Sequence, residues 1–360
     1  MATWQHGRTA PSHYGVARGA ASIPERSVNE AQTYPDRSET ADRPPKKRLM
    51  DQVREAIQVR HYSPLTEKVY ASWIRRFIFF FDKRHPNEMG EPEIATFVSY
   101  LATRRHVSAS TQNQALSALI FLYRHVLHRE LDYMRIERAK RPARLPVVLT
   151  HPEATAILVR LEGVMWLMAS LMYGSGLRVL ECCRIRVKDI DFERHEIVVR
   201  NGKGEKDRIT MLPRKLVDPL QRHLQRVRHQ HWADIKRRAG YVELPYALGR
   251  KYPNAARQWG WQWVFPATRI YTDRETRERR RHHLDKTVVQ RAVRQAVREV
   301  GIAKPASCHS LRHSFATRLL ELGYDIRTIQ ELMGHKDVTT TMIYCHVLNK
   351  GGRGVRSPLD

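Results

Sequence analysis

A short basic stretch punctuated by proline, residues 140–146, constrains the fold of this chain more than any other feature. It reads Lys-Arg-Pro-Ala-Arg-Leu-Pro and carries no hydrophobic periodicity, and each proline disfavours helix in the residue before it. Apolar residues at helical spacing precede this stretch, and a mixture of helix-like and strand-like patterns follows it. We therefore expect the 360 residues to form two domains joined by a linker over residues 139–150.

The segment before the linker, residues 46–138, has the pattern of a small helical bundle. Ser63 and Pro64 form a helix-start signal, and apolar residues then recur every three to four positions from Val69 to Phe81. The same spacing predicts two further helices, around residues 94–101 and 116–127. Residues 1–45 are rich in Gly, Ser, Pro and Arg and lack this periodicity, which predicts a disordered basic extension.

The charge of the chain indicates a polyanionic partner. There are 63 Lys and Arg residues against 37 Asp and Glu residues, a formal net charge of +26, and such an excess favours nucleic acid binding that weakens with salt. We find no lipidation signal, basic amphipathic anchor, signal-peptide core or apolar run of about 18 residues, so we expect no membrane partner and a cytosolic protein. The four cysteines lack the spacing of a disulfide framework or zinc ribbon.

Six side chains after the linker suit chemistry on a phosphate: Arg178, Lys203, His309, Arg312, His335 and Tyr344. His309 and Arg312 are three residues apart and would share a helix face, and Gly334 is placed to end the helix before His335. Taken singly, a residue of any of these types is more often a surface residue. The occurrence of all six together is what favours a site. His313 could form a metal pair with His309, but the neighbouring arginine fits a phosphate better.

Lys203 lies in a glycine-containing turn, residues 201–206, between two strand-like runs. The runs, residues 196–199 and 208–212, predict a β-hairpin whose tip could reach into DNA. A lysine there could protonate the 5′ oxygen that leaves when a phosphodiester is cut. Lys206 is close enough to serve instead, so spacing alone leaves both lysines open.

This constellation resembles the tyrosine recombinases, the phage-integrase-like site-specific recombinases, over about residues 50–355. The resemblance implies a mainly α fold with a small β-sheet. A helical, SAM-like core-binding domain and an α+β catalytic domain, residues 151–360, would form a C-shaped clamp on DNA. It also implies a homotetramer on two DNA sites, with the residues after Tyr344 docked on a neighbouring subunit.

The resemblance also assigns roles within the site. Arg178 and Arg312 would clamp the scissile phosphate, and Lys203 would be the general acid. Tyr344 would attack to form a 3′-phosphotyrosine, and Glu181 matches the acidic residue one helical turn after the first arginine. Among the histidines, we expect His309 to be the base and His335 to hydrogen-bond the phosphate. No metal, ATP or other cofactor is expected, because side chains supply the cations and the phosphotyrosine conserves the bond energy.

A long segment, residues 241–283, separates two predicted helices and carries a second constellation. Trp259, Trp261 and Trp263 alternate along the chain, and the pair His282–His283 follows. Alternation alone indicates a half-buried strand with one face in the core. The segment also resembles the insertion of integron integrases, which recognises bases extruded from a folded single strand. That resemblance implies stacking on Trp261, His282 and His283, with Trp259 and Trp263 as further candidates.

The expectation from the whole sequence is an integron integrase in the bacterial cytosol. Such an enzyme would insert and excise gene cassettes, acting on a duplex integron site and a folded single-stranded cassette site. Within the family, the alternative is a generic phage- or chromosome-type recombinase acting on duplex sites. Outside it, the alternative is a non-catalytic DNA-binding protein.

Overall fold

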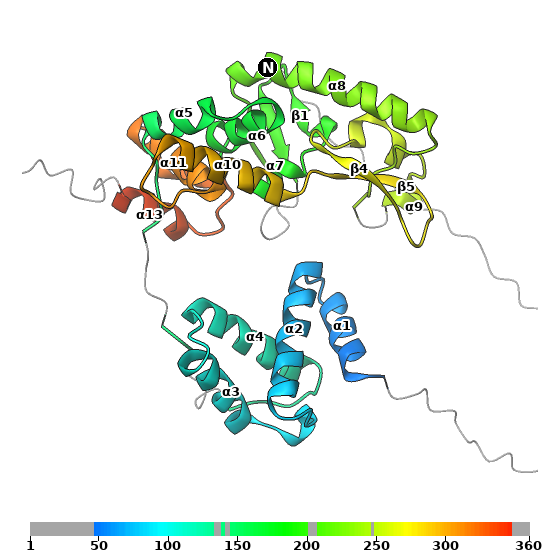
Figure 1. Ribbon diagram of the computed structural model, residues 1–360, viewed down its shortest axis with the longest axis vertical. Helices are drawn as coiled ribbons and strands as arrows, with labels where there is room; N and C mark the ends of the chain where they lie inside the picture. The colour runs from blue at the N-terminus through cyan, green and yellow to red at the C-terminus, as the bar shows by residue number, and fades with distance from the viewer. Residues whose placement is uncertain (1–46, 133–137, 141–144, 201–206, 246–247, 348–360) are drawn as a thin grey trace, which may run out of the picture. The chain divides into compact units, whose positions relative to one another are not determined.

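The computed structural model describes residues 47–132, 138–140, 145–200, 207–245 and 248–347, and the chain divides into two compact units (Figure 1). The division falls between Arg141 and Pro142. We call the two parts the N-terminal unit and the C-terminal unit. The basic extension expected over residues 1–45 lies outside the described residues.

Helices build the described part of the N-terminal unit. Ser63 begins the second of them by accepting a hydrogen bond from the Thr66 N–H, with Pro64 at the first helical position, as the sequence predicts. Ser108 and the Thr111 N–H begin the fourth in the same way. The elements are α1 (Leu49–Val59), α2 (Pro64–Phe80), the 3₁₀ turn η1 (Pro86–Glu88), α3 (Glu91–Thr103) and α4 (Ala109–His125).

Two aromatic residues of α2 lie in the core of the N-terminal unit. Trp73 and Phe77 are buried, and the Phe77 ring centroid lies 5.5 Å from that of Phe97 on α3. Helix α1 was not predicted as a separate element, although its apolar residues recur at helical spacing. Val53 and Ile57 are buried, and Leu49, Met50 and Ala56 pack partly buried against the same core.

The chain between the two units is held at both ends. Ala139 exchanges two hydrogen bonds with the Asn113 side chain on α4, at 2.9 and 3.1 Å. Leu149 is buried in the C-terminal unit and donates its N–H to Ser314 Oγ at 2.8 Å. The stretch expected as a linker, residues 139–150, therefore begins and ends as part of packed structure.

The C-terminal unit is mostly helical, with two small antiparallel sheets among its described residues. One sheet has the order β1-β2-β3, and β2 pairs with β3 in the register from Glu196↔Met211 to Val199↔Arg208, which confirms the predicted hairpin. Its tip, which carries Lys203 and Lys206, lies outside the described residues. The other sheet, β4–β5, lies within the long segment 241–283 and was not expected, because the β5 sequence Arg-Arg-Arg-His-His has no apolar alternation.

The first elements of the C-terminal unit are α5 (His151–Val159), α6 (Gly163–Gly174), α7 (Val179–Cys183), η3 (Val187–Asp189), β1 (Ile190–Asp191), β2 (Glu196–Val199), β3 (Arg208–Met211), η4 (Arg214–Leu216) and α8 (Val217–Lys236). The later elements are α9 (Leu248–Lys251), η5 (Ala255–Arg257), η6 (Trp259–Trp261), β4 (Pro266–Thr272), β5 (Arg279–His283), α10 (Lys286–Val300), α11 (Cys308–Glu321), α12 (Ile326–Met333) and α13 (Thr339–Val347). The most apolar helix, α6, is central to the core, and α5, α10 and α11 pack around it. Helix α13 packs on α11 and α12, which brings the end of the described chain beside α11.

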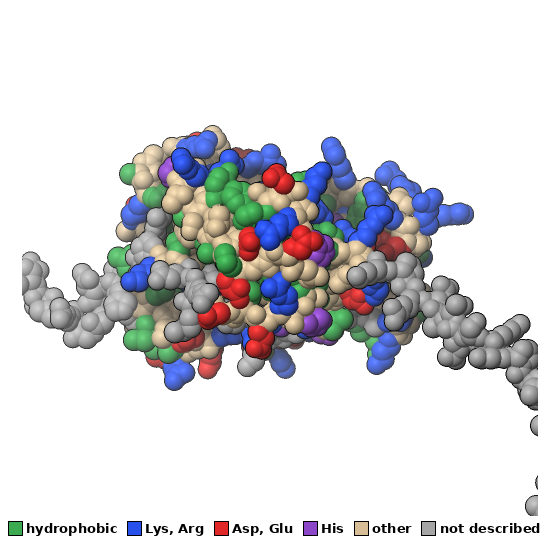
Figure 2. Space-filling view, turned by 90° about the horizontal axis from the view of Figure 1, so that it is seen from below, with side chains coloured by type: hydrophobic (Ala, Val, Ile, Leu, Met, Phe, Trp, Pro, Cys, Tyr) green, Lys and Arg blue, Asp and Glu red, His purple; other side chains and the backbone are tan. Residues whose placement is uncertain are grey.

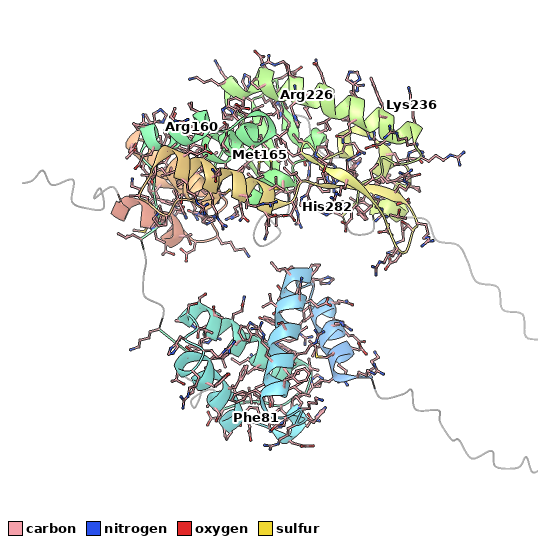
Figure 3. All side chains as sticks on the ribbon, in the orientation of Figure 1. Phe81, Arg160, Met165, Arg226, Lys236 and His282 are labelled. Carbon is pink, nitrogen blue, oxygen red and sulfur yellow. The ribbon has the colours of Figure 1, made fainter. Side chains whose placement is uncertain are left out.

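Basic side chains are spread widely over the protein. Figure 2 shows Lys and Arg side chains over much of the face in view, with Asp and Glu side chains among them. Within the C-terminal unit, Arg226 and Lys236 on α8 lie on the side away from His282 (Figure 3). None of the described helices is long and apolar enough to cross a membrane.

A buried ion pair joins the unexpected sheet to α8. Arg281 on β5 donates to both carboxylate oxygens of Asp234, at 2.7 and 2.9 Å, and both side chains are almost fully buried. We expect Asp234→Ala to lower the free energy of unfolding by about 3–5 kcal/mol, because it leaves a buried guanidinium without its counterion. Urea unfolding measures this loss. Glu321→Ala, which breaks the exposed Arg318–Glu321 pair, is the matched control and should cost at most about 1 kcal/mol.

Candidate active site

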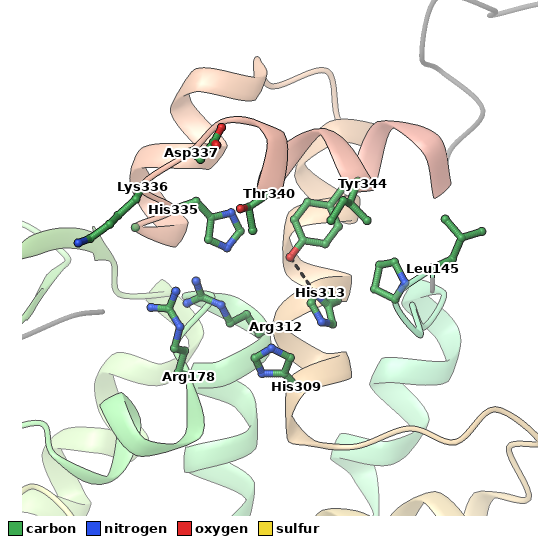
Figure 4. A pocket seen from close by; sticks show the side chains of 13 residues that line it. Leu145, Arg178, His309, Arg312, His313, His335, Lys336, Asp337, Thr340 and Tyr344 are labelled. Carbon is green, nitrogen blue, oxygen red and sulfur yellow. Dashed lines mark hydrogen bonds between the residues drawn. The ribbon is translucent and has the colours of Figure 1, made fainter. Parts of the chain in front are cut away.

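One pocket of about 770 Å³ in the C-terminal unit is lined by five of the six side chains predicted for phosphate chemistry (Figure 4). They come from four places in the chain and are Arg178, His309, Arg312, His335 and Tyr344. The sixth, Lys203, lies outside the described residues. Leu145 and Pro146, from the end of the expected linker, also line this pocket, and nothing in their sequence indicates that role.

Two arginines lie side by side at the floor of the pocket. Arg178 is the residue before α7, and Arg312 lies on α11 with only 1% of its surface exposed. The guanidinium of Arg312 donates hydrogen bonds to the backbone carbonyls of Gly176 and Met333. Gly176 adopts a φ of 63°, and a Cβ there would overlap the Phe315 ring, so only glycine fits at this position, whose carbonyl accepts from Arg312.

Glu181 connects the two arginines. It accepts hydrogen bonds from the Arg178 side chain at 2.5 Å and the Arg178 N–H at 2.8 Å, and it lies 3.6 Å from Arg312. A third arginine, Arg208 at the start of β3, donates to both of its oxygens at 2.7 and 3.0 Å and to the Leu332 carbonyl at 2.9 Å. Burial would raise the pKa of the Glu181 carboxyl, but hydrogen bonds and charge from Arg208 and Arg178 lower it to about 2.

Arg208 was not a candidate from the sequence, where it appears as one basic residue among many. Its only sequence signal is its position at the start of the second strand-like run, residues 208–212. In the structure it links that hairpin to Glu181 and to the end of α12.

His335 projects from the end of α12, as predicted. Gly334 ends the helix in the left-handed conformation, with a φ of 60°, and a Cβ there would lie 2.7 Å from the Arg208 side chain. His335 Nδ1 hydrogen-bonds Thr341 Oγ1 at 2.9 Å, and its ring stacks near Tyr344 with centroids 6.3 Å apart. Burial and the nearby arginines lower the pKa of His335 to about 3, so its imidazole is neutral at pH 7.

Tyr344 lies on α13, as predicted, with 2% of its surface exposed. Its hydroxyl is hydrogen-bonded to Nδ1 of His313 at 2.7 Å (Figure 4). Burial raises the pKa of Tyr344 to about 12, although Arg312 and Arg178 oppose that rise. The sequence suggests His313 only as a possible metal partner of His309, and no group of three or more potential metal ligands occurs among the described residues.

A second pocket, of about 630 Å³, adjoins the first and shares Arg178 with it. Four of the five residues predicted to bind extruded bases line it: Trp261, Trp263, His282 and His283. Trp259 packs instead against the core, with its ring 6.1 Å from His231. The alternative of one half-buried strand through the three tryptophans is wrong, because Trp259–Trp261 forms the 3₁₀ turn η6.

The rings in the second pocket differ in their surroundings. Trp261 is partly exposed with Lys188 Nζ 3.0 Å from its ring centroid, and Trp263 is 6% exposed with the Arg186 guanidinium 3.8 Å away. His282 is partly exposed, whereas His283 is buried and hydrogen-bonds the Leu284 carbonyl at 2.8 Å. Burial is the main reason that the pKa of His283 falls to about 4.

Two family models match this chain. The model of the phage integrase family matches residues 148–350, and that of the phage integrase N-terminal SAM-like domain matches residues 49–133. Proteins named integrase/recombinase from Escherichia coli and Pseudomonas aeruginosa are each 50% identical over 324 residues, which cover 89% of this chain and 96% of each relative.

Solved structures show the same fold. A lambda integrase dimer bound to a core site has a TM-score of 0.56 and 19% identity, over 86% of this chain and 96% of that one. The XerH site-specific recombinase in a post-cleavage complex with its difH substrate also has a TM-score of 0.56 and 19% identity, over 84% of each chain. The helical SAM-like domain followed by a mainly α domain with small sheets is therefore the architecture of this chain too.

Proposed function

The chain belongs to the phage integrase family, the tyrosine recombinases, and on that premise we propose that it is an integron integrase that inserts and excises gene cassettes. Family membership makes it a site-specific recombinase, an enzyme that cuts and rejoins DNA. The observation that carries the finer proposal is the second pocket, where Trp261, Trp263 and His282 lie beside Arg178 of the first pocket.

For the chemical step, we propose that Arg178 and Arg312 hold the non-bridging oxygens of the scissile phosphate. Their guanidiniums are permanently charged forks, and Glu181 holds both close to the same pocket. His309 and His335 line the same pocket and would donate hydrogen bonds to the phosphate. Tyr344 would then attack the phosphorus to form a 3′-phosphotyrosine, while Lys203 on the β2–β3 hairpin protonates the leaving 5′ oxygen.

We propose duplex DNA as a partner and a homotetramer as the assembly that joins two sites. The formal net charge of +26 supports the first. For the second, a lambda integrase tetramer bound to a Holliday junction shares the fold of this chain with a TM-score of 0.56 and 18% identity.

Extruded bases of a folded single strand would bind in the second pocket. Trp261 and His282 line it with partly exposed rings, on which an unpaired base can stack. Trp263 also lines this pocket, but with 6% of its surface exposed it can offer a base only a small part of its ring. Because Arg178 lines both pockets, a base held here would lie close to the scissile phosphate.

Covalent trapping tests this function. Two libraries with randomised arms, one of nicked duplexes and one of folded single-stranded hairpins, are incubated with the protein, and the DNA captured covalently is sequenced. The most frequent members then serve as defined substrates. We expect Tyr344-dependent capture that favours hairpins, whereas capture of duplex alone would identify a duplex-specific recombinase.

We expect Trp261→Ala to reduce capture of hairpins about 10- to 100-fold and to leave capture of nicked duplex unchanged. A lost base-stacking contact is worth about 1–3 kcal/mol, and duplex DNA offers no unpaired base to stack. Capture rates on the two defined substrates measure the effect. Trp232→Ala, which removes an exposed tryptophan from α8, is the control. An equal loss on both substrates would count against the pocket as a base site.

A further inference from the structure

We propose that His313 is a further catalytic residue, the base that receives the proton of Tyr344 when the phenol attacks DNA. The inference rests on the proposed function, because it concerns the same reaction. It gives to His313 the role that the sequence favours for His309.

The hydrogen bond of the nucleophile carries this inference. Tyr344 Oη and His313 Nδ1 are 2.7 Å apart, and both side chains line the pocket of the two arginines. The ring of His309 packs edge-to-face on His313, with centroids 4.6 Å apart and an interplanar angle of 89°. His313 therefore lies between His309 and the phenol, where it can take a proton directly (Figure 4).

Helix packing sets up this contact. His313 follows Arg312 on α11, and Tyr344 lies on α13, which packs against α11. His335, at the end of α12, stacks near the Tyr344 ring with an interplanar angle of 21°. The phenol thus lies beside residues from α11 and from the end of α12, with its hydroxyl hydrogen-bonded to His313.

The proton transfer balances without any further reactant. In the Nε2–H tautomer, His313 Nδ1 is an acceptor. During cleavage the Oη–H bond breaks and its proton passes to Nδ1, the Oη–P bond forms, and the P–O5′ bond breaks. The leaving O5′ takes its proton from a different group, which we propose to be Lys203. During religation the proton on Nδ1 returns to Tyr344.

The charges around His313 suit a base that starts neutral. His309 and Arg312 face it from α11, Tyr344 faces it from α13, and His335 lies near it after α12. Burial, followed by His309 and Arg312, lowers the pKa of His313 to about 4, so the imidazole is free to accept a proton at pH 7. The scissile phosphate brings negative charge into the pocket and would stabilise the imidazolium formed during attack.

The test compares His313→Asn with His309→Asn in single-turnover cleavage of a nicked duplex selected by covalent capture. An asparagine amide can replace the hydrogen bond to Tyr344 but cannot hold the proton. We expect His313→Asn to cleave about 10²- to 10⁴-fold more slowly at pH 7. Its rate should rise about tenfold per pH unit between pH 7 and 9.5, as phenolate forms without the base. The parent and His309→Asn should show no such slope.

A modified substrate separates this role from that of the general acid. With sulfur in place of the bridging 5′ oxygen, the leaving group needs no proton, so Lys203→Ala should recover and His313→Asn should not. Parent-like rates for His313→Asn, a tenfold slope in His309→Asn instead, or full recovery with sulfur would each overturn the inference. His313→Gln provides a second variant if asparagine prevents folding. A parent that forms no Tyr344 adduct would overturn the proposed function itself, and this inference with it.

Discussion

Replacing Tyr344 with phenylalanine is expected to abolish covalent capture of DNA, a loss of at least about 10⁴-fold, while DNA binding remains. The substitution removes only the hydroxyl, so the buried ring keeps its packing against α11 and α12. The lost hydrogen bond to His313 should cost about 1 kcal/mol of unfolding free energy. Denaturing gel electrophoresis measures the adduct, and a mobility-shift assay measures binding.

A second variant controls for the loss of a tyrosine hydroxyl elsewhere in the C-terminal unit. Tyr324→Phe changes an exposed tyrosine in the same unit and should leave capture at the parental level. Covalent adduct that persists in Tyr344→Phe would show that another residue is the nucleophile. If Tyr344→Phe no longer binds DNA, Tyr344 contributes to DNA recognition.

The other large effect is expected from Arg312→Lys, which should slow cleavage about 10²- to 10³-fold. The guanidinium donates to the carbonyls of Gly176 and Met333 and still has N–H groups to offer a phosphate. An ammonium group has only three donors around one point charge, so it cannot hold both carbonyls and two phosphate oxygens in a planar fork. Single-turnover cleavage of the selected nicked duplex measures the loss.

Arg318→Lys on the same helix is the matched control, because Arg318 is partly exposed and paired with Glu321. A substrate with a modified scissile phosphate further tests the role of Arg312. A neutral methylphosphonate at the scissile position removes the charge that Arg312 would neutralise, so it should narrow the difference between Arg312→Lys and the parent. If the cleavage rates of Arg312→Lys and the parent differ by the same factor on the methylphosphonate substrate, the role of Arg312 lies in folding and not at the phosphate.

Local signals in the sequence were sufficient for several elements of the fold. The Ser63–Pro64 start of α2, the end of α12 at Gly334 and the β2–β3 hairpin all have the expected form. Each depends on contacts between residues close in the chain, such as a cap, a left-handed glycine or the pairing of consecutive strands. Short-range rules can therefore place these elements without knowledge of the rest of the fold.

Other features had no local signal. The β4–β5 sheet includes an arginine-rich strand. Arg281 of that strand pairs with Asp234 on α8, 47 positions away, and donates hydrogen bonds to two backbone carbonyls of β4. Trp259 and Trp261 share one 3₁₀ turn, yet one packs in the core and the other lines the second pocket. Their alternation in sequence does not show which of the two packs in the core and which lines the pocket.

The sequence by itself determined the kinds of side chain available for phosphate chemistry, the helices and hairpin that carry them, and the positive charge of the chain. Tertiary structure alone decided which of them meet. Packing of α13 on α11 pairs Tyr344 with His313 and not with His309, and Arg208 reaches Glu181 across 27 positions of chain. The physical reason is that hydrogen bonds and ion pairs act over about 3 Å, so distant residues become partners only when helix packing and sheet pairing bring their atoms that close.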